Sequence, residues 1–313
     1  MGRPFTPHIV TEESASSAQV IDGSLKFDKD LTHYLTKTLS SVGNQKTFTF
    51  SCWCKRSSFA THSALFSSSG NGDFFKFSFR DDNRFEINTT DGGSDSTHLF
   101  STARFRDTGW YHIVIAFDTT QATSTNRVKF YVNNTQITDF DLSTYPGQNV
   151  DTSANDNVQH MIGNQVGNTR YFDGMISNVY MIDGQQLAST EFGFTDPLTN
   201  TWRPKKYTGT YGTNGFYLPM DGNSLIGEDK SGNGNNYGPV NFGGSNTLEK
   251  ATGALPILNT VNGGNVATVG VRTDAYASNL VLAVPLNATT QDYSGQINNS
   301  RTPLTFSVNG NAA

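Results

Sequence analysis

Acidic residues are the side chains of this sequence best suited to chemistry, because two carboxylates can together hydrolyse a glycosidic bond. Such a pair must flank one bond, with the carboxyl groups about 5–9.5 Å apart. The glutamates are Glu12, Glu13, Glu86, Glu191, Glu228 and Glu249. Glu86, in RFEINTT, stands alone on its expected strand. The sequence therefore carries no signal for glycan hydrolysis, although a pair assembled from distant segments stays open.

Nucleophilic and phosphate chemistry leave no signature either. Neither a Gly-x-Ser-x-Gly elbow nor a Walker loop occurs in the sequence. The glycine-rich run GNGNNYG (232–238) has the wrong spacing for a phosphate loop and precedes no helical pattern, so it is interpreted as a cluster of turns. A Ser-His-Asp triad built from distant segments stays open. We expect a protein that is not an enzyme.

The two cysteines have the spacing of core residues. Cys52 and Cys54 lie in TFTFSCWCK (47–55), where a strand places them on the same face as Phe48 and Phe50. Two buried, reduced thiols are therefore expected. The histidines are His8, His33, His62, His98, His112 and His160. Their spacing lacks the HxxxH pattern, and the cysteines lack the CxxC pattern, so no zinc site is predicted.

Composition favours strands over helices. Of the 313 residues, only 35% are hydrophobic and 16% are charged, yet 22 are Phe and 12 are Tyr. No apolar run is long enough for a transmembrane helix, so membrane insertion is not expected. A net charge of −5 without a basic run argues against nucleic-acid binding. The opening MGRPFTPHIVTEES lacks the basic and apolar regions of a secretory signal peptide.

Alternating apolar residues predict short strands separated by turn residues. Strands or hairpins are expected at 47–55, 74–89, 109–118, 126–138, 159–166 and 171–183. In the hairpin at 126–138, Phe130 and Val132 share one face and Tyr131 lies on the other. Turn signals recur at about 8–20 residues, which indicates an antiparallel β-sandwich or jelly roll.

Four ordered motifs carry a resemblance to a known fold family. They are WYHIVIAFD, VKFYVNN, MIGN and FDGMISNVYMIDG. Their order over residues 23–195 resembles the laminin-G-like, concanavalin A-like jelly roll. The resemblance implies an all-β sandwich whose last segment is a long inner strand, and Met175, Ile176, Val179 and Met181 suit that strand. It also implies that QQLASTEFG (185–193) is a short surface helix-turn. The Glu-x-Asp-x-x-Glu run of the family's glucanase branch is absent.

Other segments resemble structural proteins of marine tailed phages. These are the stretches at 23–58, 202–242 and 253–286. The resemblance implies a virion protein, a tail-fibre or receptor-binding component that contacts host-surface glycans and forms a homo-oligomer. Decoration of the capsid surface, as a knob or fibre, is the alternative within the virion. A glycan depolymerase on the same fold and a cellular adhesion or secreted lectin domain are the alternatives of other classes.

Four regions follow from these patterns. They are an N-terminal segment (1–22) that attaches to other virion proteins, a jelly roll (23–200), an extension or linker that adds strands to it (201–278), and the start of a second β domain (279–313). A weak internal repeat supports the last boundary. Residues 216–242 parallel 282–306, each with an apolar run, Pro and an Asp-x-Ser-Gly that begins at Asp229 or Asp292.

Aromatic residues in loops are the candidates for glycan contact, because their rings stack on sugars. Tyr145, Tyr171, Trp202 and Tyr211 are those candidates, and each suits packing against the fold equally well. Trp53 and Trp110 fall in strands and are expected to belong to the core or a sheet face. If the ring of Trp110 is buried, Trp110→Ala should destabilise the sandwich by about 3–5 kcal/mol.

Calcium is the one ion that the resemblance allows, since many laminin-G-like domains bind it at the rim of the sandwich. The acidic residues near expected loops are Asp81, Asp82, Asp118, Asp151, Asp156 and Asp173. Aspartate in a turn usually accepts hydrogen bonds from its own backbone, so none of them is assigned as a ligand. No cofactor is expected to be required.

Overall fold

The computed structural model describes residues 19, 21, 23–59, 61–70, 72–167, 169–221 and 224–242. The segment at 253–286, the second copy of the repeat and most of the N-terminal segment lie outside these residues. Within them the chain forms strands and two short 3-10 helices, η1 (Ser124–Asn126) and η2 (Ser189–Glu191). The described residues include no helix that could cross a membrane.

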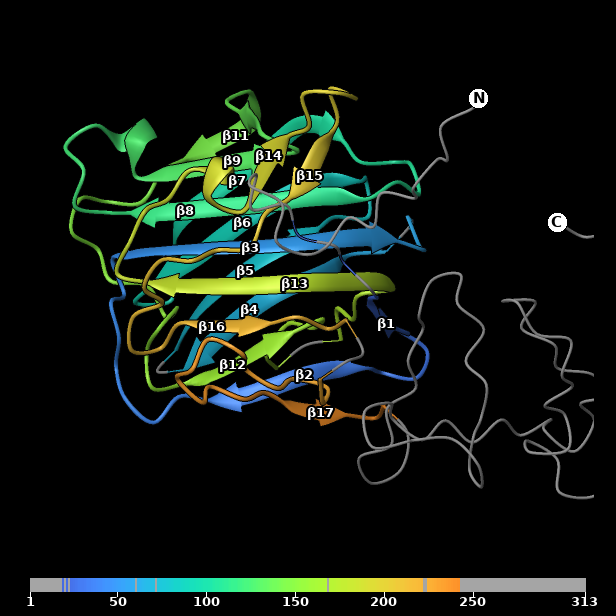
Figure 1. Cartoon of the computed structure of the whole chain (residues 1–313). Coiled ribbons are helices and arrows are strands. Elements are labelled where there is room, and N and C mark those ends of the chain that lie inside the picture. The colour runs from blue at the N-terminus through green and yellow to red at the C-terminus, as the bar shows by residue number, and fades with distance from the viewer. Residues whose placement is uncertain are drawn as a thin grey trace, which may run out of the picture.

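The first sheet has seven antiparallel strands in the order β1-β13-β3-β8-β9-β10, with β16 paired to β13. Its strands are β1 (Leu25–Phe27), β3 (Thr47–Arg56), β8 (Tyr111–Asp118), β9 (Val128–Val132), β10 (Thr135–Ile137), β13 (Gly174–Asp183) and β16 (Phe216–Leu218). This sheet faces the viewer in Figure 1, with β3, β8 and β13 as its long central strands.

The second sheet has eight strands in the order β11-β7-β6-β5-β4-β12-β2-β17. Its strands are β2 (Tyr34–Thr38), β4 (Ser63–Gly70), β5 (Asp73–Phe79), β6 (Arg84–Asp91), β7 (Ser94–Arg104), β11 (Phe140–Thr144), β12 (Gln159–Ile162) and β17 (Gly238–Val240). A small separate pair consists of β14 (Gly193–Thr195) and β15 (Trp202–Pro204). The two large sheets pack face to face, so the predicted all-β sandwich is confirmed.

Phenylalanine fills the space between the sheets. Phe48 of β3 stacks on Phe117 of β8 with ring centroids 5.0 Å apart, and both rings meet Phe75 from the opposite sheet. Cys52 and Cys54 lie in the same core and form no disulfide, as the alternation in 47–55 predicted. Large, fully desolvated rings on both inner faces are the main source of stability in such a sandwich.

Both predicted hairpins are confirmed. Strands β5 and β6 pair antiparallel, and so do β9 and β10. The turn between β9 and β10 is Asn133-Asn134, with φ of 47° and 70°. Two successive left-handed residues make the tight turn that matches the twist of a hairpin, and asparagine tolerates this conformation.

The long inner strand is confirmed as β13, and the four residues expected on it lie there, on both of its faces. Ile176, Val179 and Met181 are buried in the core, whereas Met175 lies on the other face and is only half-buried. Adjacent residues of a strand point to opposite faces, so Met175 and Ile176 cannot both face inward. A bulge at Asn178, where φ is 48°, then restores the inward direction at Val179.

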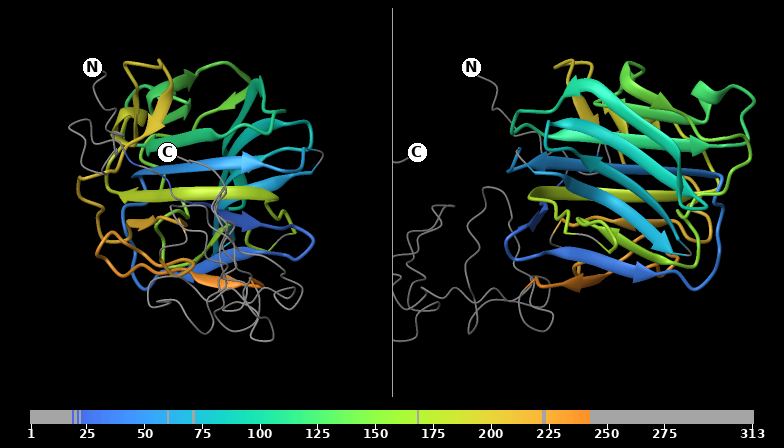
Figure 2. Two further views of the ribbon diagram at one scale, coloured as in Figure 1. Left: turned by 45° about the vertical axis from the view of Figure 1, so that its right-hand side comes forward. Right: turned by 180° about the vertical axis from the view of Figure 1, so that it is seen from behind.

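The described residues form a covering layer on one outer face of the sandwich. After β13 the chain folds back over the seven-stranded sheet, where Phe192, Tyr207 and Tyr217 pack on Val114 and Tyr180 in a second apolar cluster. Strands β16 and β17 then add to the two large sheets. Seen from behind, strands β4 to β7 of the eight-stranded sheet carry no such layer formed by the described residues (Figure 2). We call this side of the sandwich the open face.

Trp110 lies just before its expected strand and outside the core, so the condition for a large destabilisation, a buried ring, is not met. It precedes β8 and is 39% exposed, because the apolar inward pattern of this strand begins only at Tyr111. We therefore expect Trp110→Ala to lower the free energy of unfolding by less than about 1 kcal/mol. Urea unfolding would measure this, with Trp53→Ala as the comparison, since Trp53 is buried and stacks on His112. A loss near 3 kcal/mol at Trp110 would contradict its exposed position.

Candidate functional site

The open face of the eight-stranded sheet carries a polar cluster. On β5, β6 and β7, the residues Phe77, Ile87 and Leu99 are in register and point into the core. Their strand neighbours therefore point outward. We call the resulting group the Glu86 cluster, and it consists of His62, Lys76, Ser78, Arg80, Glu86 and His98.

Glu86 is the centre of this cluster, and only 3% of its side chain is exposed. Its Oε2 atom lies 2.8 Å from Nε2 of His62 and 3.1 Å from Nζ of Lys76. Ser78 donates a hydrogen bond of 2.9 Å to the same oxygen. Its Oε1 atom lies 3.1 Å from Nε2 of His98 and 3.5 Å from Nη1 of Arg80. One carboxylate thus positions four nitrogen-bearing side chains.

The surroundings keep this carboxylate ionised. Burial raises the pKa of Glu86, but the hydrogen bond to His62 and the charge of Lys76 outweigh burial and hold that pKa far below its ordinary value. Burial lowers the pKa of Lys76, and Glu86 opposes that shift. Glu86 cannot serve as a general acid at neutral pH, because it carries no proton to donate.

A second carboxylate suited to hydrolysis is missing from the described part of this face. Arg80 also contacts Asp82, at 3.8 Å. Burial raises the pKa of Asp82, but the hydrogen bonds from Arg84 outweigh burial and bring that pKa below its ordinary value. The Asp82 carboxylate is therefore ionised as well. A glycosidase needs one carboxyl group that is protonated at its working pH. Neither Glu86 nor Asp82 meets that requirement.

Aromatic rings and a loop border the cluster. Phe100 is half-buried, with the guanidinium carbons of Arg80 and Arg84 at 4.3 Å and 5.3 Å from its ring centre. Phe74 lies beside Lys76, whose Nζ is 5.5 Å from that ring. On the other side, the loop that follows β12 contacts β4, because the hydroxyl of Ser67 donates a hydrogen bond of 2.9 Å to the backbone carbonyl of Asn164. The result is a polar surface with apolar borders.

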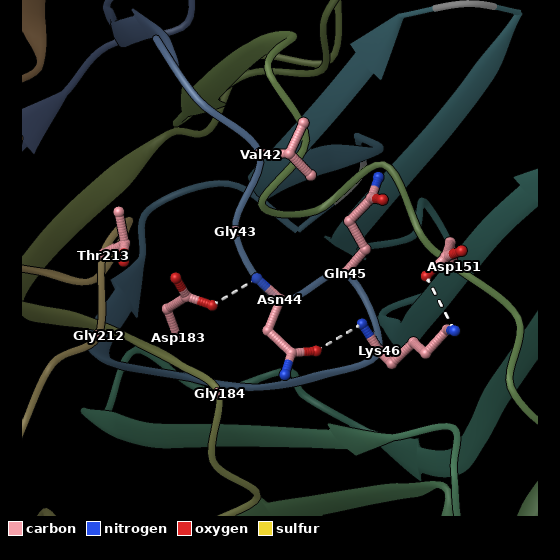
Figure 3. A pocket seen from close by; sticks show the side chains of 10 residues that line it. All are labelled: Val42, Gly43, Asn44, Gln45, Lys46, Asp151, Asp183, Gly184, Gly212 and Thr213. Atoms are coloured by element: carbon pink, nitrogen blue, oxygen red, sulfur yellow. Dashed lines mark hydrogen bonds and ion pairs between the residues drawn. The ribbon is translucent and has the colours of Figure 1, made fainter.

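A hollow with a volume of about 570 Å³ lies at the rim of the sandwich, away from the Glu86 cluster (Figure 3). Asp183 lies at its wall, and its carboxylate accepts hydrogen bonds from the backbone of Asn44 at 2.8 Å and of Asn214 at 3.0 Å. The amide of Asn155 donates to it as well, at 3.3 Å. Asp183 therefore joins three loops, and its oxygens are already used by the protein.

The aspartates considered for calcium are spread over several turns. Asp118 accepts hydrogen bonds from Thr120 and Gln121 of its own turn, and Asp151 lies 3.7 Å from Lys46. Burial raises the pKa of Asp173. Among the described residues, no three acidic, histidine or cysteine side chains come together as a metal site. Calcium binding stays a prediction without assigned ligands.

The structure does not bring the four predicted glycan-contact residues together. Tyr145 packs against Phe140 and Tyr171 against Tyr34, with ring centroids 6.4 Å and 6.2 Å apart. Tyr211 packs on Tyr207, within the layer that covers the seven-stranded sheet.

Trp202, the remaining one of the four, is tied to His112 by a hydrogen bond of 2.9 Å from its indole nitrogen. All four have packing contacts, and none belongs to the Glu86 cluster. Their contact with glycans stays a prediction.

His112 also forms a buried pair with Ser51, in which Oγ and Nε2 are 2.9 Å apart. The indole of Trp202 can only donate, so Nδ1 of His112 must be the acceptor and Nε2 must carry the proton. The histidine then donates to Ser51 and cannot take its proton. This pair anchors Trp202 and is not a nucleophile with its base.

Sequence reasoning missed the Glu86 cluster, although a signal for it exists. Lys76 in DFFKFSF, Glu86 in RFEINTT and His98 in THLFS are each placed between apolar residues of alternating strands. The alternation shows that all three point away from the core. It does not show that they meet, since that depends on how the three strands are paired.

Comparisons with known proteins agree with this architecture. A family model described as the concanavalin A-like lectin/glucanases superfamily matches residues 29–191. Among solved structures, a candidate carbohydrate-binding protein from Bacteroides ovatus is 18% identical with a TM-score of 0.44, and the match covers 70% of this chain and 58% of that one. An SAP-like pentraxin from Limulus polyphemus is 13% identical with a TM-score of 0.39, and the match covers 55% and 81%. A search of curated proteins finds no match.

Proposed function

The chain belongs to the concanavalin A-like lectin/glucanases superfamily, and on that premise we propose that it is a non-catalytic glycan-binding protein. The observation that carries this proposal is the Glu86 cluster, an ordered set of hydrogen-bond donors on the outer sheet face over which the described residues form no covering layer (Figure 2). Binding sites combine a few fixed polar groups with apolar surroundings, which here are Phe74 and Phe100.

The arrangement suits a sugar better than an apolar ligand. Glycan hydroxyl groups need partners in fixed directions, and Glu86 holds Arg80 and His98 in place for them. Side chains ordered before binding lose little entropy when the ligand arrives. Hydrolysis is the weaker alternative, because Glu86 and Asp82 are both held ionised.

We expect Arg80→Ala to weaken glycan binding by about tenfold or more, which corresponds to about 1.4 kcal/mol. The measurement is binding of the full chain to a panel of immobilised bacterial polysaccharides. Arg203→Ala is the control, since Arg203 lies on β15 in the layer over the other sheet and is 52% exposed. If both variants bind like the unchanged protein, the Glu86 cluster is not the binding surface.

We also propose that this protein is a component of a phage particle, most simply a homo-oligomeric tail-fibre or receptor-binding protein. The resemblance of 23–58 and of 202–242 to phage structural proteins supports this role. Gln19 offers a second argument, because its backbone nitrogen donates to Pro204 and its side chain to Tyr217, both on the covered side. Attachment through residues 1–22 would thus leave the open face free.

Gold-labelled antibody against the chain, applied to intact particles, tests the virion role. Label at the tail supports host recognition. Label over the capsid supports the alternative role in capsid decoration. Absence of label from every particle contradicts the virion proposal and leaves the glycan-binding proposal to its own test.

A further inference from the structure

The Glu86 cluster and its borders hold more positive than negative charge. Among the side chains that the structure describes there, the cationic ones are Lys76, Arg80, Arg84 and Arg170, and the carboxylates are Glu86, Asp82 and Asp141. Four cations against three anions leave one positive charge, on a chain whose net charge is −5. Asp82 and Asp141 both pair with Arg84, so the excess lies near Lys76 and Arg170.

Of these four cations, Arg170 is the one for which the described residues provide no acidic partner. Its backbone carbonyl accepts a hydrogen bond of 2.9 Å from Ala64 of β4, and Ala64 is paired with Ser78 of the cluster. Its Nη1 atom donates to the side-chain carbonyl of Gln165 at 2.9 Å. Burial is the first cause of the lowered pKa of Lys76, and the charges of Arg170 and Arg80 add to it. Lys76 and Arg80 share the carboxylate of Glu86, and Arg170 adds a positive charge that has no anion of its own. Such an excess of like charge is a local electrostatic conflict of the kind found at binding sites.

An oxyanion would relieve this conflict. A guanidinium presents parallel N–H donors that match the two oxygens of a carboxylate or sulfate, and a neighbouring ammonium adds a charge-assisted hydrogen bond. Arg170 is half-buried in the loop that contacts β4, and the side chain of Lys76 is 6% exposed. A group bound between them would lie against Phe74.

We propose that the Glu86 cluster selects glycans that carry an oxyanion, either a carboxylate or a sulfate, and that Arg170 and Lys76 receive this group. The inference rests on the proposed glycan-binding function and names its ligand class. Neutral glycans then bind through the hydroxyl contacts alone and more weakly.

Matched pairs of polysaccharides test this inference with the full chain. The probes are polygalacturonate against its methyl ester, and dextran sulfate against dextran. We expect at least one charged member to bind about tenfold more tightly than its neutral partner, and the difference to shrink as NaCl rises from about 50 mM to about 500 mM. The pair that shows the difference identifies carboxylate or sulfate as the recognised group.

Arg170→Gln is expected to remove the preference while neutral binding persists, and Arg203→Gln is expected to leave it intact. Equal affinity within both pairs contradicts the oxyanion inference and leaves the glycan-binding proposal standing. If the protein binds none of these probes and no member of the panel of bacterial polysaccharides, both proposals are contradicted. A preference that survives Arg170→Gln contradicts the assignment of the site.

Discussion

Glu86→Gln is expected to lower the free energy of unfolding by about 3–5 kcal/mol, the usual effect of removing one partner from a buried ion pair. The neutral amide leaves Lys76, which is 6% exposed, without its anion. Its NH₂ group also points a donor toward His62 or His98, where the carboxylate accepted hydrogen bonds. The stability of the open face therefore depends on one charge.

Urea unfolding of a small set of variants tests this dependence. The double variant Glu86→Gln/Lys76→Met should recover more than half of the loss, because it removes the stranded cation together with its partner. Asp141→Asn is the matched control, since Asp141 pairs with Arg84 but is 46% exposed, and it should change stability by less than about 1 kcal/mol. A loss at Glu86 as small as that of the control would contradict the role given to this carboxylate.

Acidification from pH 7 to pH 5 is expected to lower the free energy of unfolding by about 4 kcal/mol through two buried histidines. Burial lowers the pKa of His112 to about 3 and that of His160 to about 4. An unfolded histidine has a pKa of about 6.5, so below that pH both histidines bind protons in the unfolded chain but stay neutral in the folded chain. The stability is therefore present above pH 6.5 and is lost as the pH falls toward the folded pKa values, by about 1.4 kcal/mol per unit for each histidine.

The variants His112→Gln and His160→Gln show how much of this loss of stability each histidine causes. Each should reduce the slope of stability against pH between 6.5 and 5, whatever it does to stability at pH 7. Glu86 does not contribute to this slope. Its lowered pKa stabilises the fold, and that stabilisation is lost only below about pH 4.3, the pKa of an unfolded glutamate. Slopes equal to that of the unchanged protein in both variants would show that these histidines do not drive the acid response.

The sequence was sufficient to predict the parts of the fold that depend on local alternation. The inward face of β3 and the hairpin at Asn133-Asn134 follow from a period of two and from turn chemistry, which nearby residues decide. The bulge at Asn178, which returns Val179 to the inward face, was not predicted, because no local pattern signals it. Trp110 was misassigned because an apolar residue next to a strand was counted as part of the strand.

The Glu86 cluster could not be predicted because its residues meet only through strand pairing. Lys76, Glu86 and His98 come from three strands, and only strand pairing places Lys76 and His98 around the carboxylate. Aromatic residues in loops were the candidates available to sequence reasoning, and Trp202 shows that a distant partner can use the polar atom of such a residue. Its indole nitrogen is occupied by His112, a partner 90 residues away.

Side-chain footprinting with hydroxyl radicals, on the full chain with and without bound polysaccharide, tests the central claim most directly. The account predicts that ligand protects His62, His98 and Phe100 on the open face, while Trp202 and Tyr211 keep the labelling they have without ligand. Protection of Trp202 and Tyr211 with unchanged labelling of the Glu86 cluster would contradict it, and would move the binding surface to the opposite side of the sandwich.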